Sequence, residues 1–192
     1  MNFLAHIYLS GNNEELKFGN FIGDWIKGNK YMNYKGDIRR GILLHREIDG
    51  YTDSHPMVDL SVERLRPAYG KHAAVAVDIL YDHYLAKNWE NYSEVPLKKY
   101  VKEFHLYVLT HFHLLPSGAK RFAFPFIRNR RLLCYADLRC FEDVLEKMAI
   151  YTSMPDKVSE AMNIIRLYYK DFEEEFKDFF EDLRRFVEGK GF

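Results

Sequence analysis

Residues 41–55, GILLHREIDGYTDSH, interleave ionisable and apolar side chains, and three of the ionisable groups recur at intervals of four. On a helix, His45, Asp49 and Asp53 would form one polar stripe, because residues four apart lie on the same face. The Ile and Leu side chains between them would lie elsewhere on the helix surface, where they can be buried. The stripe can therefore line a pocket inside a helical bundle instead of facing solvent.

Three other segments each place Asp or His in an apolar background. Asp24 lies in GNFIGDWIKG, and His6 follows MNFLA at the start of the chain. Asp78 and Asp82 lie four apart in VAVDILYDHYLAKNW. A buried carboxylate carries a large desolvation cost unless it is paired, hydrogen-bonded or bound to a metal. A mixed set of imidazoles and carboxylates suits Mn²⁺, Fe²⁺ or Zn²⁺ better than Ca²⁺, and bundle interiors commonly hold such sites.

Each of these residues also has a purely structural explanation. The alternatives are a hydrogen-bonded core histidine for His6, a turn cap for Asp24, a helix N-cap for Asp53, an ion pair with Arg46 or Arg66 for Asp49, and a surface dyad for Asp82 with His83. For any one residue the structural explanation is favoured. Taken together, the residues make a metal site as strong an interpretation, and spacing alone does not decide between the two.

The elements that position these residues are predicted to be helices almost throughout, because apolar residues recur with helical spacing and no alternating run indicates a sheet. Pro and Gly separate the predicted helices, which cover about residues 2–10, 14–27, 37–54, 57–66, 70–88, 96–113, 118–129, 137–152 and 155–187. Asn13 is the predicted N-cap of the second helix, Pro67 is expected to end the fourth, and GNKYMNYKG is predicted to be a loop. The expected fold is one all-α, multi-helix domain over residues 1–192.

The last predicted helix carries an apolar seam for packing against the bundle. Its members recur at steps of three and four: Tyr169, Phe172, Phe176, Phe179, Leu183 and Phe186. Three consecutive glutamates, residues 173–175, interrupt this seam and are predicted to form the solvated side of the same helix.

Composition excludes several classes of protein. Lys plus Arg equals Asp plus Glu at 28 each, so the chain is not expected to bind nucleic acid. No stretch resembles a signal peptide or approaches the length of a membrane span, and a cytoplasmic location is the default expectation. Cys134 and Cys140 are too few for a disulfide framework and are expected to be small thiols. No P-loop, GxGxxG or GxSxG motif occurs.

Four strings occur in an order that resembles the acyl carrier protein phosphodiesterase family, also called acyl carrier protein hydrolyase. They are MNFLAH (1–6), GNFIGD (19–24), HREIDGYTDSHP (45–56) and DILYDHYLAKNW (78–89). The resemblance implies an all-α fold distantly related to the HD-type phosphohydrolases. It also implies that the protein uses a divalent metal, typically Mn²⁺, to remove 4′-phosphopantetheine from holo-acyl carrier protein and leave the apo form.

The same resemblance implies a set of site residues. The implied metal ligands are His6, Asp24, His45, Asp49, Asp53, Asp78 and Asp82. Asp24 and the His45–Asp49 turn are the favoured ligands, and His6 or Asp53 is expected to orient them. Catalytic roles fall to Asp24, Asp82 and His83. The chain has no His-Asp dipeptide, and its adjacent pair is the reversed Asp82-His83, so the ligand set of HD-type enzymes does not transfer directly.

An acidic carrier protein as substrate requires a basic docking patch on an otherwise neutral enzyme. The preferred patch leads into the opening segment and contains Lys27, Arg39, Arg40 and Arg46. A second cluster interleaves with phenylalanines and contains Arg121, Arg128, Arg130 and Arg131. Two alternatives stay open: a metal-dependent hydrolase of a nucleotide or other small phosphodiester, and a non-catalytic helical protein whose polar stripe is an ion-pair network.

Overall fold

Helices account for nearly all the regular structure of the protein. The computed structural model describes residues 2–192, and within that range it contains no strand. The α-helices are α1 (Phe3–Leu9), α2 (Glu14–Ile22), α3 (Gly36–Thr52), α4 (Pro56–Tyr69), α5 (Ala73–Lys87), α6 (Leu97–Thr110), α7 (Ser117–Arg128), α8 (Arg131–Cys134), α9 (Leu138–Tyr151), α10 (Val158–Leu167) and α11 (Tyr169–Lys190). The all-α class is confirmed, whereas the single-domain boundary and the likeness to HD-type enzymes stay predictions.

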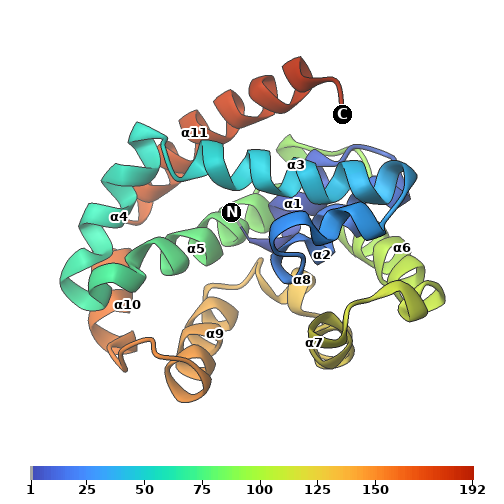
Figure 1. Ribbon diagram of the computed structural model, residues 1–192. Coiled ribbons are helices and arrows are strands. Elements are labelled where there is room, and N and C mark those ends of the chain that lie inside the picture. The colour runs from blue at the N-terminus through green and yellow to red at the C-terminus, as the bar shows by residue number, and fades with distance from the viewer. Residues whose placement is uncertain (1) are drawn as a thin grey trace.

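The short helix α1 lies near the middle of the molecule, where it contacts α2 and α5 (Figure 1). In the view of Figure 1, α3, α4 and α11 pass above α5, and α7, α8 and α9 lie below it. The helix α1 is almost entirely buried: Leu4, Ala5 and Ile7 are each 0% exposed. Residues at the start of the chain therefore contribute to the centre of the bundle.

Helices α2 and α3 pack against each other at very short range. A Cβ atom on Gly19 would lie only 2.1 Å from the carbonyl oxygen of Ile38 on α3. Only glycine permits this approach, because any side chain would collide with the backbone of the neighbouring helix. The close contact brings the C-terminal end of α2 beside the polar stripe of α3.

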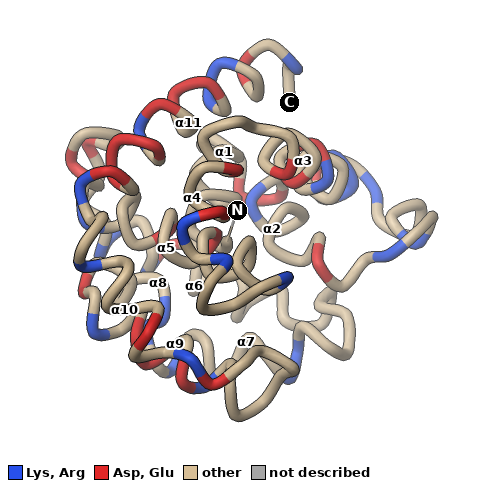
Figure 2. The backbone as a smooth tube through the Cα atoms, turned by 90° about the vertical axis from the view of Figure 1, so that its left-hand side faces the viewer, with Lys and Arg blue, Asp and Glu red and all other residues tan. Residues whose placement is uncertain are grey.

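The apolar seam near the C-terminus packs as predicted, but on a helix that starts later. Phe172, Phe176 and Phe179 are buried against the bundle. The single helix predicted over 155–187 is wrong, because Tyr168, with φ −107° and ψ 25°, separates α10 from α11. No Pro or Gly marks this break in the sequence. The outer length of α11 carries charges of both signs (Figure 2).

Other local predictions are also wrong. Helix α4 does not end at Pro67 but continues to Tyr69, because a proline in the last turn removes only one backbone hydrogen bond. The segment predicted as a loop is largely a 3₁₀-helix, Gly28–Asn33. The prediction for Asn13 is confirmed, since its side chain accepts a hydrogen bond from the Leu16 backbone N–H at 3.1 Å.

The glutamate run at 173–175 is not uniformly solvated. Glu175 is only 7% exposed and accepts hydrogen bonds from Nε and Nη2 of Arg64, at 3.0 and 2.8 Å. Its second oxygen accepts a hydrogen bond from the Ser61 hydroxyl at 2.6 Å. The prediction is therefore wrong for Glu175, whose carboxylate joins α11 to α4.

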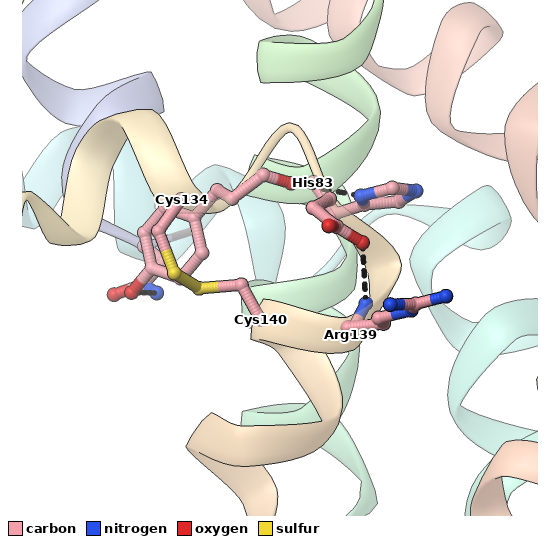
Figure 3. The surroundings of a disulfide bond; sticks show 7 residues. His83, Cys134, Arg139 and Cys140 are labelled. Carbon is pink, nitrogen blue, oxygen red and sulfur yellow. Dashed lines mark hydrogen bonds between the residues drawn. A yellow bond between two sulfur atoms is a disulfide. The ribbon is translucent and has the colours of Figure 1, made fainter.

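The cysteines form a disulfide, so the prediction of two thiols is wrong. The Cα atoms of Cys134 and Cys140 lie 5.6 Å apart, inside the range that a disulfide spans. The bond joins the end of α8 to the start of α9, beside His83 and Arg139 (Figure 3). No helix within residues 2–192 is long and apolar enough to cross a membrane.

Candidate metal centre

Three side chains from α1 and α3 gather into a compact cluster. One ligand atom from each of His6, His45 and Asp49 lies within 4.8 Å of the others. The Nε2 atom of His6 is 3.2 Å from one carboxylate oxygen of Asp49, and the Nε2 atom of His45 is 3.1 Å from the other. The two imidazole rings stack with their centroids 4.2 Å apart. Four-residue spacing on α3 aligns His45 with Asp49, and packing of α1 adds His6.

Asp24 lies at the edge of this cluster. It belongs to the 3₁₀-helix Gly23–Trp25 that follows α2, and its carboxylate is 3.5 Å from Nε2 of His45. The preceding Gly23 packs directly on the His45 ring: a Cβ atom there would lie 2.3 Å from Cγ of His45. The glycine therefore allows the backbone that carries Asp24 to approach the imidazole.

Asn20 determines which nitrogen of His6 faces the cluster. The side-chain nitrogen of Asn20 donates to the His6 carbonyl at 2.8 Å and to the Ser10 hydroxyl at 3.0 Å. The Asn20 oxygen is therefore the acceptor for Nδ1 of His6, 2.7 Å away. With Nδ1 as the donor, neutral His6 presents the lone pair of Nε2 to Asp49. Metal-binding histidines are usually oriented by a partner of this kind.

Burial and charge separate the two histidines. Burial, reinforced by the neighbouring His45, lowers the pKa of His6 to about 4. Burial also opposes the charge on His45, but hydrogen bonds to Asp24 and Asp49 outweigh it and raise its pKa to about 9.

The carboxylates of the cluster favour their charged forms. The hydrogen bond with His45 lowers the pKa of Asp24. Burial would raise the pKa of Asp49, but its hydrogen bond with His45 prevails and lowers it. Nε2 of His6 and the Asp49 oxygens converge on one position, which is the arrangement that a shared cation needs. A divalent ion that prefers imidazole and carboxylate ligands fits this donor set.

Two further predicted ligands lie nearby without joining the three-residue cluster. Asp53 is the C-cap of α3, and Asp78 lies on α5. Both line the cavity onto which Asp24 and Asp49 also open. Burial raises the pKa of Asp78. The structure therefore places these two carboxylates along the cavity wall and leaves their predicted role as ligands untested.

The structure does not bring Asp82 and His83 to the cluster. The Asp82 carboxylate accepts hydrogen bonds from the backbone N–H groups of Leu4 and Ala5, at 2.8 and 3.0 Å, at the N-terminal end of α1. Burial raises the pKa of Asp82 to about 7. The His83 ring lies between the Tyr135 carbonyl, 2.8 Å from Nδ1, and the Tyr169 hydroxyl, 2.6 Å from Nε2. These contacts favour structural roles for both residues.

Most of the preferred basic patch is used to hold the chain together. Arg39 donates hydrogen bonds to the Tyr34 and Met32 carbonyls, and Arg46 donates to those of Ile26 and Gly28. These contacts fix the segment that leads into α3. Arg40 pairs with Asp37 at 2.7 Å, while Lys27 is exposed. The patch retains positive charge, and Lys27 is the one of its four members whose side chain forms no hydrogen bond or ion pair within residues 2–192.

The sequence interpretation did not single out Asn20 or Gly23, although both lie inside the quoted string GNFIGD. Asn20 lies four residues before Asp24 in an apolar segment. A buried amide is normally hydrogen-bonded, so an Asn at this position indicates a neighbouring polar side chain that it holds in place. Gly23 directly precedes Asp24, and a glycine beside a candidate ligand indicates close backbone approach.

Fold and site together define an all-α protein in which two histidines and a carboxylate offer a cation-binding cluster beside an open cavity. Residues 1–183 match the family described as "Acyl carrier protein phosphodiesterase". This match covers most of the chain, and the protein belongs to that family, whose members carry the name of a phosphoric diester hydrolase.

Individual relatives agree with this membership. The chain is 30% identical to the acyl carrier protein phosphodiesterase of Photorhabdus laumondii subsp. laumondii, over 100% of this chain and 98% of the relative. It is 29% identical to the protein of the same name from Yersinia enterocolitica, over 94% of each chain. The Enterobacter sp. relative is 30% identical, again over 94% of each. No solved structure matches the chain.

Proposed function

We propose that this protein hydrolyses the phosphodiester that joins 4′-phosphopantetheine to the serine of holo-acyl carrier protein, and so releases the apo-carrier protein. Family membership supports the substrate. The observation that carries the chemistry is the convergence of His6, His45 and Asp49 within 4.8 Å, with the His6 tautomer fixed by Asn20.

The residues present fit a divalent metal, with Mn²⁺ as the ion that the family resemblance implies. Nε2 of His6, Nε2 of His45 and the Asp49 carboxylate would hold it, and Asp24 is close enough to complete the set. When bound, such an ion polarises a phosphoryl oxygen and lowers the pKa of a bound water. Asn20 holds His6 in the tautomer that this requires.

Asp24 is the carboxylate we assign to proton transfer. Its side chain is 52% exposed, lines the cavity and lies beside His45. A carboxylate in that position can take a proton from the attacking water or return one to the leaving serine oxygen. Asp82 and His83, the other predicted catalytic residues, hold α1 and the segment around Tyr135 in place.

The carrier protein is proposed to dock beside Lys27, Arg39, Arg40 and Arg46. Because Arg39 and Arg46 also fix the backbone, charge reversal there would disturb the fold. Lys27→Glu is the cleaner test, since Lys27 is exposed. We expect this substitution to raise KM for the carrier protein more than KM for a small phosphodiester. Equal effects on both substrates would contradict the docking role.

The function is tested by mass spectrometry of holo-carrier protein incubated with the purified protein and Mn²⁺. We expect the carrier protein to lose the mass of phosphopantetheine, and Asp24→Ala to abolish this loss. A parallel assay with bis(p-nitrophenyl) phosphate measures activity on a small diester. Intact carrier protein together with rapid hydrolysis of the small diester would support the alternative, a hydrolase of nucleotides or other small phosphodiesters.

A further inference from the structure

A cavity of about 670 Å³ opens beside the cluster and shares Asp24 and Asp49 with it. Its volume lies within the range of roughly 300–1,000 Å³ that is usual for small-ligand sites. The space is far larger than a metal ion needs. A ligand that reached the cluster would therefore have most of its atoms against other parts of the wall.

One wall of the cavity is mainly apolar. Helix α9 contributes Val144, Met148 and Tyr151, which follow one another at steps of four and three and so share one face of the helix. Helix α5 contributes Val75 and Ile79 from the facing side. Val144 and Ile79 are 7% and 4% exposed, whereas Tyr151 is 82% exposed. The wall thus runs from a buried floor to an open rim.

Charges divide the rest of the lining. The carboxylates are Asp24, Asp49, Asp53 and Asp78. The two cations of the lining are Arg131 on α8 and Lys147 on α9, and both helices lie below α5 in Figure 1. Asp49 and Asp53 belong to α3 and its C-terminal end, and α3 lies above α5. Within residues 2–192, neither Arg131 nor Lys147 forms an ion pair with a carboxylate. The carboxylates outnumber the two cations in the lining, but Arg131 and Lys147 come from α8 and α9 and are available to an anionic group of a ligand.

We propose that this cavity binds the 4′-phosphopantetheine arm, with its phosphate between the cluster and the Arg131–Lys147 pair and its branched aliphatic chain along the α5–α9 wall. The inference rests on the proposed function and adds the site that recognises the arm. Lys147 shares its helix face with Val144 and Met148, so one face of α9 contacts both the charged and the apolar parts of the ligand.

The aliphatic residues of the α5–α9 wall suit an aliphatic arm, and a nucleotide is the ligand from which this arm must be distinguished. Val75, Ile79, Val144 and Met148 offer contact to dimethyl and methylene groups, whereas the aromatic side chains of the lining, such as Tyr151, offer a face on which a base can stack. The hydroxyl of Tyr135, another lining residue, already accepts a hydrogen bond from the Asn2 side chain at 2.9 Å. A nucleotide of equal charge is accordingly the competing ligand to measure.

Calorimetric titration of the wild-type protein, with and without Mn²⁺, tests the proposal with four probes: 4′-phosphopantetheine, pantetheine, inorganic phosphate and AMP. We expect phosphopantetheine to bind at least about tenfold more tightly than each of the other three, because only it engages both wall and cations. Equal affinity for inorganic phosphate would overturn the aliphatic subsite. Equal affinity for AMP would overturn the assignment to the arm.

Substitutions in the cavity lining test which side chains contact the arm. Met148→Trp, which fills the wall, and Lys147→Gln, which removes one cation, should each weaken phosphopantetheine binding about tenfold and raise KM for holo-carrier protein. Ile150→Trp and Arg139→Gln are the matched controls, since both side chains are exposed and lie outside the cavity lining. If the wild type releases the arm and the cavity variants bind and react like the controls, the subsite is wrong while the proposed function stands. If the wild type releases no arm, the proposed function fails.

Discussion

The Nδ1 atom of His6 lies 2.7 Å from the side-chain oxygen of Asn20, and this contact directs Nε2 of the same ring at Asp49. Asn20 is 0% exposed, and both hydrogens of its amide are engaged by the His6 carbonyl and the Ser10 hydroxyl. The orientation of the amide is therefore fixed by its surroundings. A residue outside the cluster decides which atom His6 offers to a cation.

Asn20→Leu should therefore lower the affinity for Mn²⁺ by about 10- to 100-fold, because His6 loses the partner that fixes its tautomer. Asn20→Asp keeps an acceptor for Nδ1 but places a second oxygen against the His6 carbonyl, so its affinity should lie between those of Asn20→Leu and the wild type. Isothermal titration of metal into both variants measures the effect directly. Wild-type affinity in Asn20→Leu would show that the orientation of His6 does not depend on Asn20.

Gly23→Ala should displace the His45 ring, since the new Cβ atom would fall 2.3 Å from its Cγ. We expect at least about a tenfold loss of activity, because small misplacements of catalytic groups are costly. Circular dichroism should show helix content close to that of the wild type. Gly189→Ala is the control, because a Cβ atom at that position meets nothing within 4 Å. Equal activities in the two variants would refute the role of Gly23.

Glu175→Ala should lower the free energy of unfolding by about 3 kcal/mol, because it leaves Arg64 and Ser61 without their partner in a largely buried network. Urea denaturation followed by circular dichroism provides the measurement. Glu174→Ala removes an exposed carboxylate from the same helix and should change stability by less than about 0.5 kcal/mol. A similar loss in both variants would argue against a specific contribution from Glu175.

The His105 ring should make stability depend on pH. Burial lowers its pKa to about 4 from an ordinary value of 6.5, and its Nε2 atom is buried without a hydrogen-bond partner. The unfolded chain therefore binds a proton that the folded chain rejects. Stability is retained above pH 6.5 and falls by about 1.4 kcal/mol per unit as the pH drops toward 4.

His105→Phe removes this titration and fills the same space with an apolar ring. Its unfolding free energy should fall less steeply than that of the wild type between pH 6.5 and 4. His113→Gln, at an exposed position, should follow the wild type. Parallel pH profiles for wild type and His105→Phe would mean that His105 is not held neutral by burial.

Sequence periodicity predicted the parts of the site that lie on one helix. His45 and Asp49 are one turn apart on α3, and a four-residue interval is enough to align them. The addition of His6 depends on how α1 packs against α3, which no local spacing contains. For Asp82 and His83, position in the sequence does not predict the contacts. Adjacent helical residues point in different directions, and only the packed structure shows that one binds the backbone of α1 and the other Tyr169.

In the fold, too, the features set by local spacing were predictable and those set by distant contacts were not. The apolar seam of α11 was predictable because its aromatic residues recur at helical steps. The break at Tyr168 was not, because no Pro or Gly marks it in the sequence. Glu175 was assigned to solvent from its neighbours in sequence, whereas its partners Ser61 and Arg64 come from a helix more than 100 residues earlier.

A single series of mass measurements, on holo-carrier protein incubated with metal-stripped protein, tests the proposed metal centre most directly. We expect no loss of phosphopantetheine after chelation, full release when Mn²⁺ is restored, and no restoration in Asp49→Asn, which removes the carboxylate that both histidines face. Asp59→Asn, at an exposed position on α4, should behave like the wild type. Release of the arm by the chelated protein, or by Asp49→Asn at the wild-type rate, would contradict the proposed metal centre.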